Sequence, residues 1–328
     1  MKRIFSLLIL GILILTLLPP AAIAAPPQQA EGASYTVQAD DWLSKLAEKE
    51  YGDPLAYPAI VHYTNLKAAE DSTFATIENA DLIEVGWVIY LPSNEEATAF
   101  LGQVAGVGVI KIGTNAEYPP FESVDDSGNI IGFDIDLMNA IAKAAGFEVE
   151  YVNTRWDGIF VALASGEFDA VISAATITEE RAQTVDFSDS YFNAGQMIAV
   201  KVGSDIKAPA DLDGKRVGVQ LGTTGDIWTT DNTQAEVVRY DEITLAFQAL
   251  AQGDVDAVVN DGPTSAEIIK ANPEMGATLV GEPFTDELYG VAVNKGRPEV
   301  LAAINKGLAA VKASGEYDTI YNTWFGTE

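Results

Sequence analysis

The chain of 328 residues contains no cysteine. Disulfide bonds, thiol nucleophiles and thiolate metal sites are therefore excluded. The same absence leaves no cysteine to carry a lipid after export, so we expect no lipid anchor. A chain of this length can bury enough apolar surface to fold without covalent cross-links, and its 48% of hydrophobic residues is typical of a globular protein.

Histidine and basic residues are also scarce. His62 is the single histidine, and 19 lysines and arginines stand against 48 aspartates and glutamates, a formal net charge of -29. A nucleic-acid-binding protein needs a basic face to neutralise phosphates, so this composition excludes that partner. Because His62 lies in the N-terminal part, the C-terminal part lacks a Cys or His nucleophile and a Ser-His-Asp triad. A carboxylate mechanism is the catalytic route that stays open, and we expect a protein that is not an enzyme and needs no cofactor or metal.

The N-terminus has the pattern of a secretory signal peptide. Lys2 and Arg3 precede an almost wholly apolar run at residues 4–18, and residues 22–24 form a small-x-small cleavage site. The run is short for a bilayer span, which favours cleavage after residue 24 over retention as an anchor. We expect residues 1–24 to be the signal peptide and the protein to be secreted and extracytoplasmic, in a periplasm or associated with a cell wall.

Residues 34–93 form a first unit. Its predicted elements are a strand at 35–37, helices at 42–51 and 57–63, and a strand within 81–92. Their order and their residues resemble a small α+β LysM module, which implies binding of peptidoglycan. The usual turn is replaced by residues 39–41 (ADD), and residues 66–77 look like an insertion. A spacer that binds no glycan is therefore the alternative.

Residues 94–108 are rich in Ala, Gly and Glu, and we interpret them as a linker. From residue 109 onward, buried-type strands alternate with amphipathic helices in two successive series. Such alternation predicts an α/β fold with parallel sheets covered by helices. We expect one lobe at residues 109–195 and 289–328 and a second at residues 196–288, with a ligand held in the cleft where strands end.

The segment at residues 173–181 (SAATITEER) follows an apolar strand and has the pattern of a helix start. Thr176 and Thr178 suit helix caps, and Arg181 falls within the first turn. Backbone N–H groups and an arginine fork together can bind a carboxylate through parallel hydrogen bonds. The motif alone favours a capped surface helix with a solvated arginine, so the interpretation depends on the rest of the chain.

The larger part of the chain resembles a known family. From residue 109 to the C-terminus it is similar to the polar amino-acid solute-binding proteins of ABC importers, bacterial extracellular solute-binding protein family 3. The motifs that carry the resemblance are residues 113–122 (GTNAEYPPFE), 132–137 (GFDIDL), 156–158 (WDG), 166–169 (GEFD), 176–181 (TITEER), 186–188 (DFS), 212–215 (LDGK), 218–224 (GVQLGTT), 253–257 (GDVDA), 315–317 (GEY) and 324–325 (WF). The resemblance implies a two-lobe type II periplasmic-binding fold.

The resemblance also implies a ligand site for the two charges of an amino acid. Arg181 would hold the α-carboxylate, with the backbone N–H groups of Thr176 and Thr224. Asp261 would hold the α-ammonium, together with Ala174 and the hydroxyl of Thr176. A buried zwitterion needs both partners, because an unpaired charge is costly away from water.

Five other positions concern the side chain of the ligand. The resemblance implies that Tyr118 and Trp156 would sandwich it, and that Asn115, Glu117 and Gln220 would set its selectivity. Many relatives that prefer arginine or lysine have an acidic residue where this chain has Asn115. The ligand is therefore left open within the class of arginine, lysine, histidine and glutamine.

The resemblance implies a receptor that closes around an L-amino acid and delivers it to an ABC permease in the membrane. Two alternatives stay open. One is a secreted dehydratase-like enzyme of the same fold, and the other is a receptor that senses its ligand without transporting it.

For the larger part of the chain, we interpret Asp134 and Asp136 as carboxylates of a first helical turn and Glu122 as a rim or structural contact.

Overall fold

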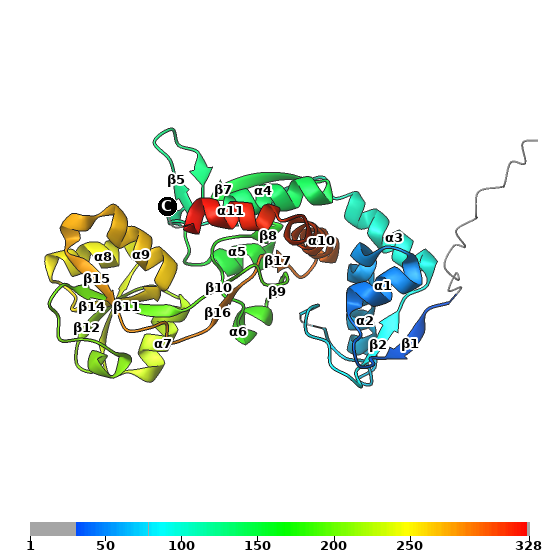
Figure 1. Cartoon of the computed structure of the whole chain (residues 1–328), viewed down its shortest axis with the longest axis horizontal. Coiled ribbons are helices and arrows are strands. Elements are labelled where there is room, and N and C mark those ends of the chain that lie inside the picture. The colour runs from blue at the N-terminus through cyan, green and yellow to red at the C-terminus, as the bar shows by residue number, and fades with distance from the viewer. Residues whose placement is uncertain (1–30, 78, 327–328) are drawn as a thin grey trace, which may run out of the picture.

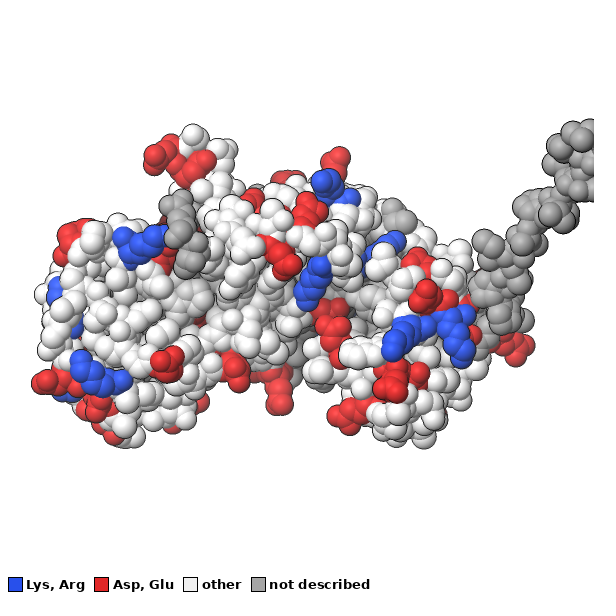
Figure 2. Space-filling view, in the orientation of Figure 1, with Lys and Arg blue, Asp and Glu red and all other residues white. Residues whose placement is uncertain are grey.

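The computed structural model describes residues 31–77 and 79–326, so the predicted signal peptide lies outside the described residues. Three bodies follow one another along the long axis of the molecule (Figure 1). The N-terminal unit lies at one end, a first lobe in the middle and a second lobe at the other end. Carboxylates are scattered over the visible face of all three (Figure 2). Within the described residues, no helix has the length and apolarity to span a membrane.

The N-terminal unit, residues 33–91, is a two-stranded antiparallel sheet with two α-helices. Its elements are β1 (Ala33–Thr36), α1 (Leu43–Tyr51), the 3-10 helix η1 (Pro54–Ala56), α2 (Tyr57–Glu70) and β2 (Val88–Leu91). Leu43, Leu46 and Ala47 of α1 recur at helical spacing and are buried in the core of this unit. Helix α2 continues beyond the predicted end at residue 63, into the segment that we interpreted as an insertion.

The segment interpreted as a linker is instead largely a helix, α3 (Asn94–Ala105). Ser93 and Glu96 form a capping box at its start, and alanine and glutamate favour helix in its interior. Phe100 and Val104 are buried in the main core. The ring of His62 stacks on Phe100 at 4.2 Å between centroids, so the single histidine has a packing role.

The N-terminal unit packs against the first lobe, on α10 (Pro298–Ser314). The hydroxyl of Tyr57 donates to Asp189 Oδ2 at 3.1 Å and contacts the carbonyl oxygen of Asn305 at 3.4 Å. The backbone N–H of Ala80 donates to the other oxygen of Asp189 at 3.3 Å. This contact lies on the side of the first lobe away from the second lobe (Figure 1).

The first lobe is built on a five-stranded sheet with the order β7-β3-β8-β17-β9. Its strands are β3 (Val109–Thr114), β7 (Glu148–Asn153), β8 (Ala170–Val171), β9 (Val185–Phe187) and β17 (Ala292–Asn294), and a small sheet is formed by β4 (Glu117–Tyr118), β5 (Glu122–Val124) and β6 (Ile130–Ile131). Its helices are α4 (Phe133–Ala145), α5 (Ile159–Ser165), α6 (Glu179–Ala182), α10 and α11 (Glu316–Phe325). Apolar residues of α4 and α10 cover one face of the sheet, and those of α5 cover the other.

The second lobe repeats this arrangement, with the strand order β13-β12-β14-β11-β15. Its strands are β11 (Gln196–Lys201), β12 (Arg216–Gln220), β13 (Glu236–Tyr240), β14 (Ala257–Asp261) and β15 (Ala277–Val280). Its helices are α7 (Thr224–Asn232), α8 (Ile243–Gln252) and α9 (Gly262–Ala271), with the 3-10 helices η2 (Pro209–Leu212) and η3 (Pro273–Met275). Alternate residues along β11 face the two sides, Ile198 toward α7 and Ala199 toward α8 and α9.

Both sheets are mixed, whereas the alternation of strands and helices predicted parallel sheets. In each, four strands are parallel and one runs antiparallel to them: β17 in the first lobe and β11 in the second. Two crossing strands, β10 (Phe192–Ala194) and β16 (Glu287–Tyr289), pair with each other between the lobes. The chain enters β11 and β17 directly from these crossings, so neither strand has the helical crossover that a parallel neighbour requires.

Candidate functional site

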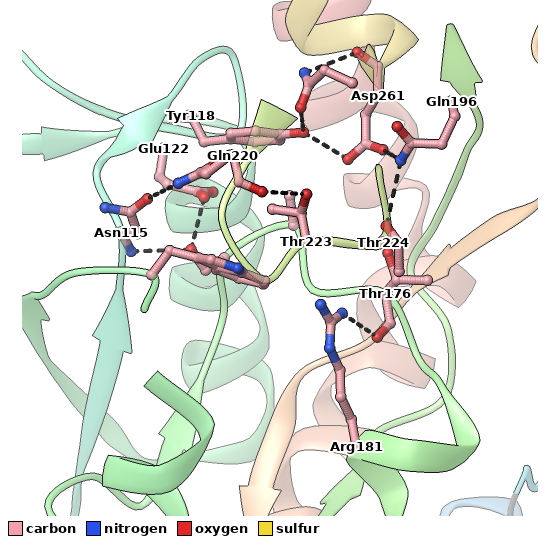
Figure 3. A pocket seen from close by; sticks show the side chains of 14 residues that line it. Asn115, Tyr118, Glu122, Thr176, Arg181, Gln196, Gln220, Thr223, Thr224 and Asp261 are labelled. Carbon is pink, nitrogen blue, oxygen red and sulfur yellow. Dashed lines mark hydrogen bonds between the residues drawn. The ribbon is translucent and has the colours of Figure 1, made fainter. Parts of the chain in front are cut away.

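A cavity lies between the two lobes. Fourteen residues line it (Figure 3): Asn115, Tyr118, Glu122, Trp156, Ser173, Ala174, Thr176, Arg181, Gln196, Gln220, Thr223, Thr224, Asn260 and Asp261. Gln220 and Asp261 end β12 and β14, and Asn115 and Ser173 follow closely on β3 and β8. Because the carboxyl ends of parallel strands meet at one sheet edge, each lobe turns such an edge toward the other.

Arg181 provides the positive charge of the cavity. It lies in the single turn of α6, where the side chain of Thr178 caps the backbone N–H of Arg181. Its Nη1 donates to the carbonyl oxygen of Thr176 at 2.8 Å, and its guanidinium carbon lies 4.7 Å from the ring centre of Phe160 and 5.2 Å from that of Trp156. Burial lowers the pKa of Arg181 to about 10, against the attraction of the Glu287 and Asp261 carboxylates. The guanidinium therefore stays charged at neutral pH, with its remaining N–H groups available for an anion.

Asp261 provides a negative charge from the second lobe. Its carboxylate accepts hydrogen bonds from the hydroxyls of Tyr118 and Tyr289 and from the amide of Gln196. Burial raises the pKa of Asp261 to about 6, while the bonds from Tyr289 and Tyr118 oppose that rise. At neutral pH the group is ionised, and a cation placed beside it would relieve the cost of its burial.

Two aromatic side chains of the first lobe complete the middle of the cavity. Tyr118 and Trp156 are both nearly buried. The hydroxyl of Tyr118, which donates to Asp261 of the second lobe, also lies 2.8 Å from Asn260 Oδ1. Aromatic faces of this kind bind apolar stems and cationic groups.

The lobes meet again through amide side chains. The amide nitrogen of Gln220 donates to Asn115 Oδ1 at 3.3 Å and lies 3.4 Å from Glu242 Oε2. Asn115 Nδ2 lies 3.5 Å from Glu242 Oε1 and donates to the carbonyl oxygen of Thr154 at 3.1 Å. Burial raises the pKa of Glu242. This part of the site therefore offers amide donors and acceptors with a carboxylate beside them.

The backbone at Ala174 adopts an unusual conformation. Its φ is 46°, a value that L-residues rarely adopt, and its N–H donates to the buried carboxyl of Asp134 at 2.8 Å. This bond offsets the backbone strain and holds the segment from Ser173 to Thr176 against the cavity. Across the cleft, Thr224 begins α7 at the position after its cap residue, Thr223.

The structure brings together all of the predicted site residues except Glu117. Glu117 is exposed on β4 and does not line the cavity. Successive side chains of a strand point to opposite faces, so Tyr118 points inward and Glu117 outward. A selectivity role for Glu117 is therefore not supported by its position.

Sequence reasoning missed five lining residues: Glu122, Ser173, Gln196, Thr223 and Asn260. Three of these residues are next to predicted site residues along the chain: Ser173, Thr223 and Asn260. Their position in the sequence could therefore have identified them. Glu122 was interpreted as a rim or structural contact, but it is fully buried and faces the cavity. Gln196 lies where the chain leaves the crossing strand, and only the tertiary structure places it beside Asp261. Within the described residues, no cluster of three or more acidic or histidine side chains could hold a metal ion.

Comparisons with known proteins agree on the region that contains the cavity. The profile of the family described as "Bacterial extracellular solute-binding proteins, family 3" matches residues 110–327. A probable histidine-binding protein of Neisseria gonorrhoeae is 41% identical over 225 residues, which cover 67% of this chain and 84% of that protein.

Solved structures are similar over the same region. An ancestral arginine-binding protein bound to arginine is 49% identical with a TM-score of 0.65, covering 67% of this chain and 99% of that one. The arginine-, lysine-, histidine-binding protein ArtJ of Geobacillus stearothermophilus is 40% identical with a TM-score of 0.64, covering 67% and 96%. These matches bear out the type II periplasmic-binding fold that the family resemblance implied.

Proposed function

The chain belongs to the bacterial extracellular solute-binding proteins, family 3, and on that premise we propose that it captures a polar or basic L-amino acid between its lobes and delivers it to an ABC permease. One observation carries the proposal. Arg181 of the first lobe and Asp261 of the second line the same cavity. They provide the fixed cation and the fixed anion that a buried zwitterion requires.

The distribution of these charges over two lobes supports capture by closure. An α-carboxylate on Arg181 and an α-ammonium on Asp261 would join the lobes through the ligand itself. Only the two crossing strands, near 193–197 and 284–289, have to bend for the lobes to separate. Binding would then favour the closed form, which a permease distinguishes from the open one.

The far side of the cavity supports a polar or cationic ligand side chain. Glu122 is a carboxyl, Asn115 and Gln220 are amides able to donate and accept, and the carboxyl of Glu242 lies beside these two amides. A cationic stem between Tyr118 and Trp156 would gain about 0.5–2 kcal/mol from the rings. The related structures bind arginine, and ArtJ binds arginine, lysine and histidine by its printed name. We assign this chain a ligand of the arginine, lysine, histidine or glutamine class.

A thermal-shift screen of the purified protein against the twenty amino acids tests the proposal. An amino acid at 100 times its dissociation constant adds about 2.7 kcal/mol to the free energy of unfolding. We expect a clear rise in Tm with at least one member of the proposed class, and none with the same amino acid for Arg181→Ala. If no amino acid raises the Tm of the wild-type protein, the proposed function is wrong.

Delivery to a permease is separable from binding. The expected result is ligand-dependent stimulation of ATP hydrolysis by the partner transporter reconstituted in vesicles. A protein that binds its amino acid tightly but does not stimulate ATP hydrolysis by the transporter would instead be a sensor. A dehydratase-like activity predicts consumption of a cyclic acid substrate, which product analysis detects directly.

We further assign residues 1–24 to a cleaved signal peptide and the N-terminal unit to attachment to a cell wall through peptidoglycan. The indole of Trp42 is 55% exposed beside α1, and a groove of about 530 Å³ runs from Trp42 past Asp81 to Lys312. An exposed aromatic face with polar side chains around it is suited to a sugar ring. Co-sedimentation with purified peptidoglycan tests this assignment. Retention that is lost in Trp42→Ala supports it, and no retention of the wild-type protein identifies the unit as a spacer.

A further inference from the structure

Two buried carboxyl groups meet in the wall of the cavity. Glu122 of β5 and Asp134 of α4 are both fully inaccessible to solvent, and they lie within hydrogen-bond reach of each other. One oxygen of each is satisfied. Glu122 Oε1 accepts from the hydroxyl of Ser173 at 2.9 Å, and Asp134 Oδ2 accepts from the N–H of Ala174 and the hydroxyl of Tyr191, each at 2.8 Å. No donor among the described residues reaches Glu122 Oε2 or Asp134 Oδ1.

A single proton explains these two unpartnered oxygens. If one carboxyl is protonated, it donates to the other. Glu122 Oε2 and Asp134 Oδ1 are then both satisfied by one hydrogen bond. If both are ionised, two like charges lie side by side away from water with neither oxygen paired.

The surroundings of the pair do not supply a compensating cation. The titratable groups that face it are Tyr118, Tyr151, Tyr191 and Tyr317, all of which are neutral at physiological pH, and Asp136 lies two positions further along α4. Among the described residues, no lysine or arginine acts on either carboxyl. Burial accordingly raises the pKa of Asp134 to about 7 and that of Glu122 well above its usual range, the latter also through the repulsion of Asp134.

The pair is connected to the ligand cavity on both sides. Glu122 lines the cavity itself, and the hydroxyl of Ser173 that it accepts from also accepts the N–H of Asn115 at 3.0 Å. Asp134 holds the strained backbone of Ala174. A positive charge that enters the cavity near Glu122 would take the place of the proton as the compensating charge.

We propose that the Glu122–Asp134 pair holds one proton in the ligand-free protein and releases it to solvent when an amino acid with a cationic side chain binds. The exchange balances: one positive charge enters the site with the ligand, and one proton leaves it for the buffer. Affinity for arginine or lysine then rises with pH, by up to about tenfold per pH unit where one proton is released. A neutral side chain such as that of glutamine brings no charge, so its binding leaves the proton in place. This inference rests on the proposed capture of an amino acid.

Isothermal titration calorimetry of the full protein in buffers of different ionisation enthalpy measures the proton count directly. At pH 7 we expect about one proton released per arginine or lysine bound and close to none per glutamine. The comparison of ligands within one protein removes the contribution of Asp261 and of the ligand α-ammonium, because every amino acid presents the same ammonium to Asp261.

Three variants locate the source of the proton. In Asp134→Asn the amide donates permanently to Glu122, so arginine binding should release no proton and its affinity should no longer rise with pH. Asp136→Asn, on the same helix but exposed and bonded to Trp324, should keep the release. Glu242→Gln should also keep the proton release. Glu242 is the other carboxyl beside the amides of the site, so this variant tests the alternative source of the proton.

Each outcome decides the matter. Amino-acid binding with a buffer-independent heat, or equal proton release with arginine and glutamine, overturns the inference and leaves the proposed function standing. Release lost in Glu242→Gln but kept in Asp134→Asn assigns the proton elsewhere and also overturns it. If no amino acid binds at all, the proposed function fails together with the inference.

Discussion

The two lobes share one architecture and differ in what they place at the cleft. Their five-stranded sheets have corresponding strand orders, each with four parallel strands and one antiparallel strand in the fourth place. The first lobe contributes the arginine, both aromatic faces and the Glu122–Asp134 pair. The second contributes Asp261 with amide and hydroxyl side chains. The sheet therefore sets only the edge where ligand groups can gather, and the residues after each strand set the chemistry.

The difference also explains why neither lobe alone would hold a zwitterion. Each presents a group that pairs with one ligand charge and leaves the other charge unpaired. Closure brings both groups to one ligand and excludes water, which strengthens each charge-assisted bond. The variants described below remove one of these groups or test how each lobe contributes to binding.

The largest effect is expected from Arg181→Ala, which removes the cation of the first lobe. Two charge-assisted bonds to the ligand carboxylate are lost, and affinity should fall by about 4 kcal/mol, roughly a thousandfold. Arg181→Lys keeps the charge without the planar fork and should fall in between. Calorimetric titration with the best ligand measures both, and an affinity within threefold of wild type for Arg181→Ala would contradict the assignment.

Asp261→Asn tests the charge of the second lobe through stability. Burial raises the folded-state pKa of Asp261 to about 6, so its proton stabilises the folded protein below about pH 4 and that contribution is lost as pH rises toward 6. Relative to Asp261→Asn, ligand-free wild-type protein should therefore lose about 2–3 kcal/mol between pH 4 and pH 7. Urea unfolding at four pH values measures the difference. Parallel profiles for the two proteins would show that Asp261 is not buried as an anion.

Tyr118→Phe removes one hydroxyl that joins the lobes. The hydroxyl of Tyr118 donates to Asp261 Oδ2 at 2.7 Å and lies 2.8 Å from Asn260 Oδ1, so without it the closed form should be less favoured and affinity should fall roughly tenfold. Tyr151→Phe is the matched control, because that hydroxyl bonds only within the first lobe, to Ile135 and Asn139. Small-angle scattering reports the closed fraction, and equal behaviour of the two variants would exclude a role in closure.

The smallest effect is expected from Arg155→Ala. Arg155 reaches Asp241 of the second lobe at 3.1 Å, but the two side chains are 77% and 61% exposed. Exposed ion pairs contribute about 0.2–1 kcal/mol and weaken as salt is added. Affinity should change less than fivefold at low salt and not measurably at high salt. A larger change would show that a surface contact outside the cavity stabilises the closed form.

The local sequence pattern predicted most helices and strands of both lobes but not the segments that connect them. In the sequence, Leu137, Ile141 and Ala145 recur at helical spacing and predict a helix at residues 133–145, which are the bounds of α4, because helical periodicity is a property of neighbouring residues. The Ala, Gly and Glu content of residues 94–108 predicted a linker, whereas the capping box of Ser93 and Glu96 starts the helix α3 there. The final helix, α11, was not predicted; it begins directly after Gly315, whose left-handed backbone ends α10.

The residue types at the site follow from the sequence: one arginine after a strand, one aspartate at the end of another, two aromatics, and no cysteine anywhere. Together with the family resemblance they predicted a site for a zwitterion, because the chemistry of each group belongs to the residue itself. The tertiary structure decided which of these groups meet. It turned Glu117 away, brought Gln196 to Asp261, joined Asn115 to Gln220 across the cleft and set Glu122 against Asp134. Such contacts depend on how the chain crosses twice between lobes, which no local periodicity records.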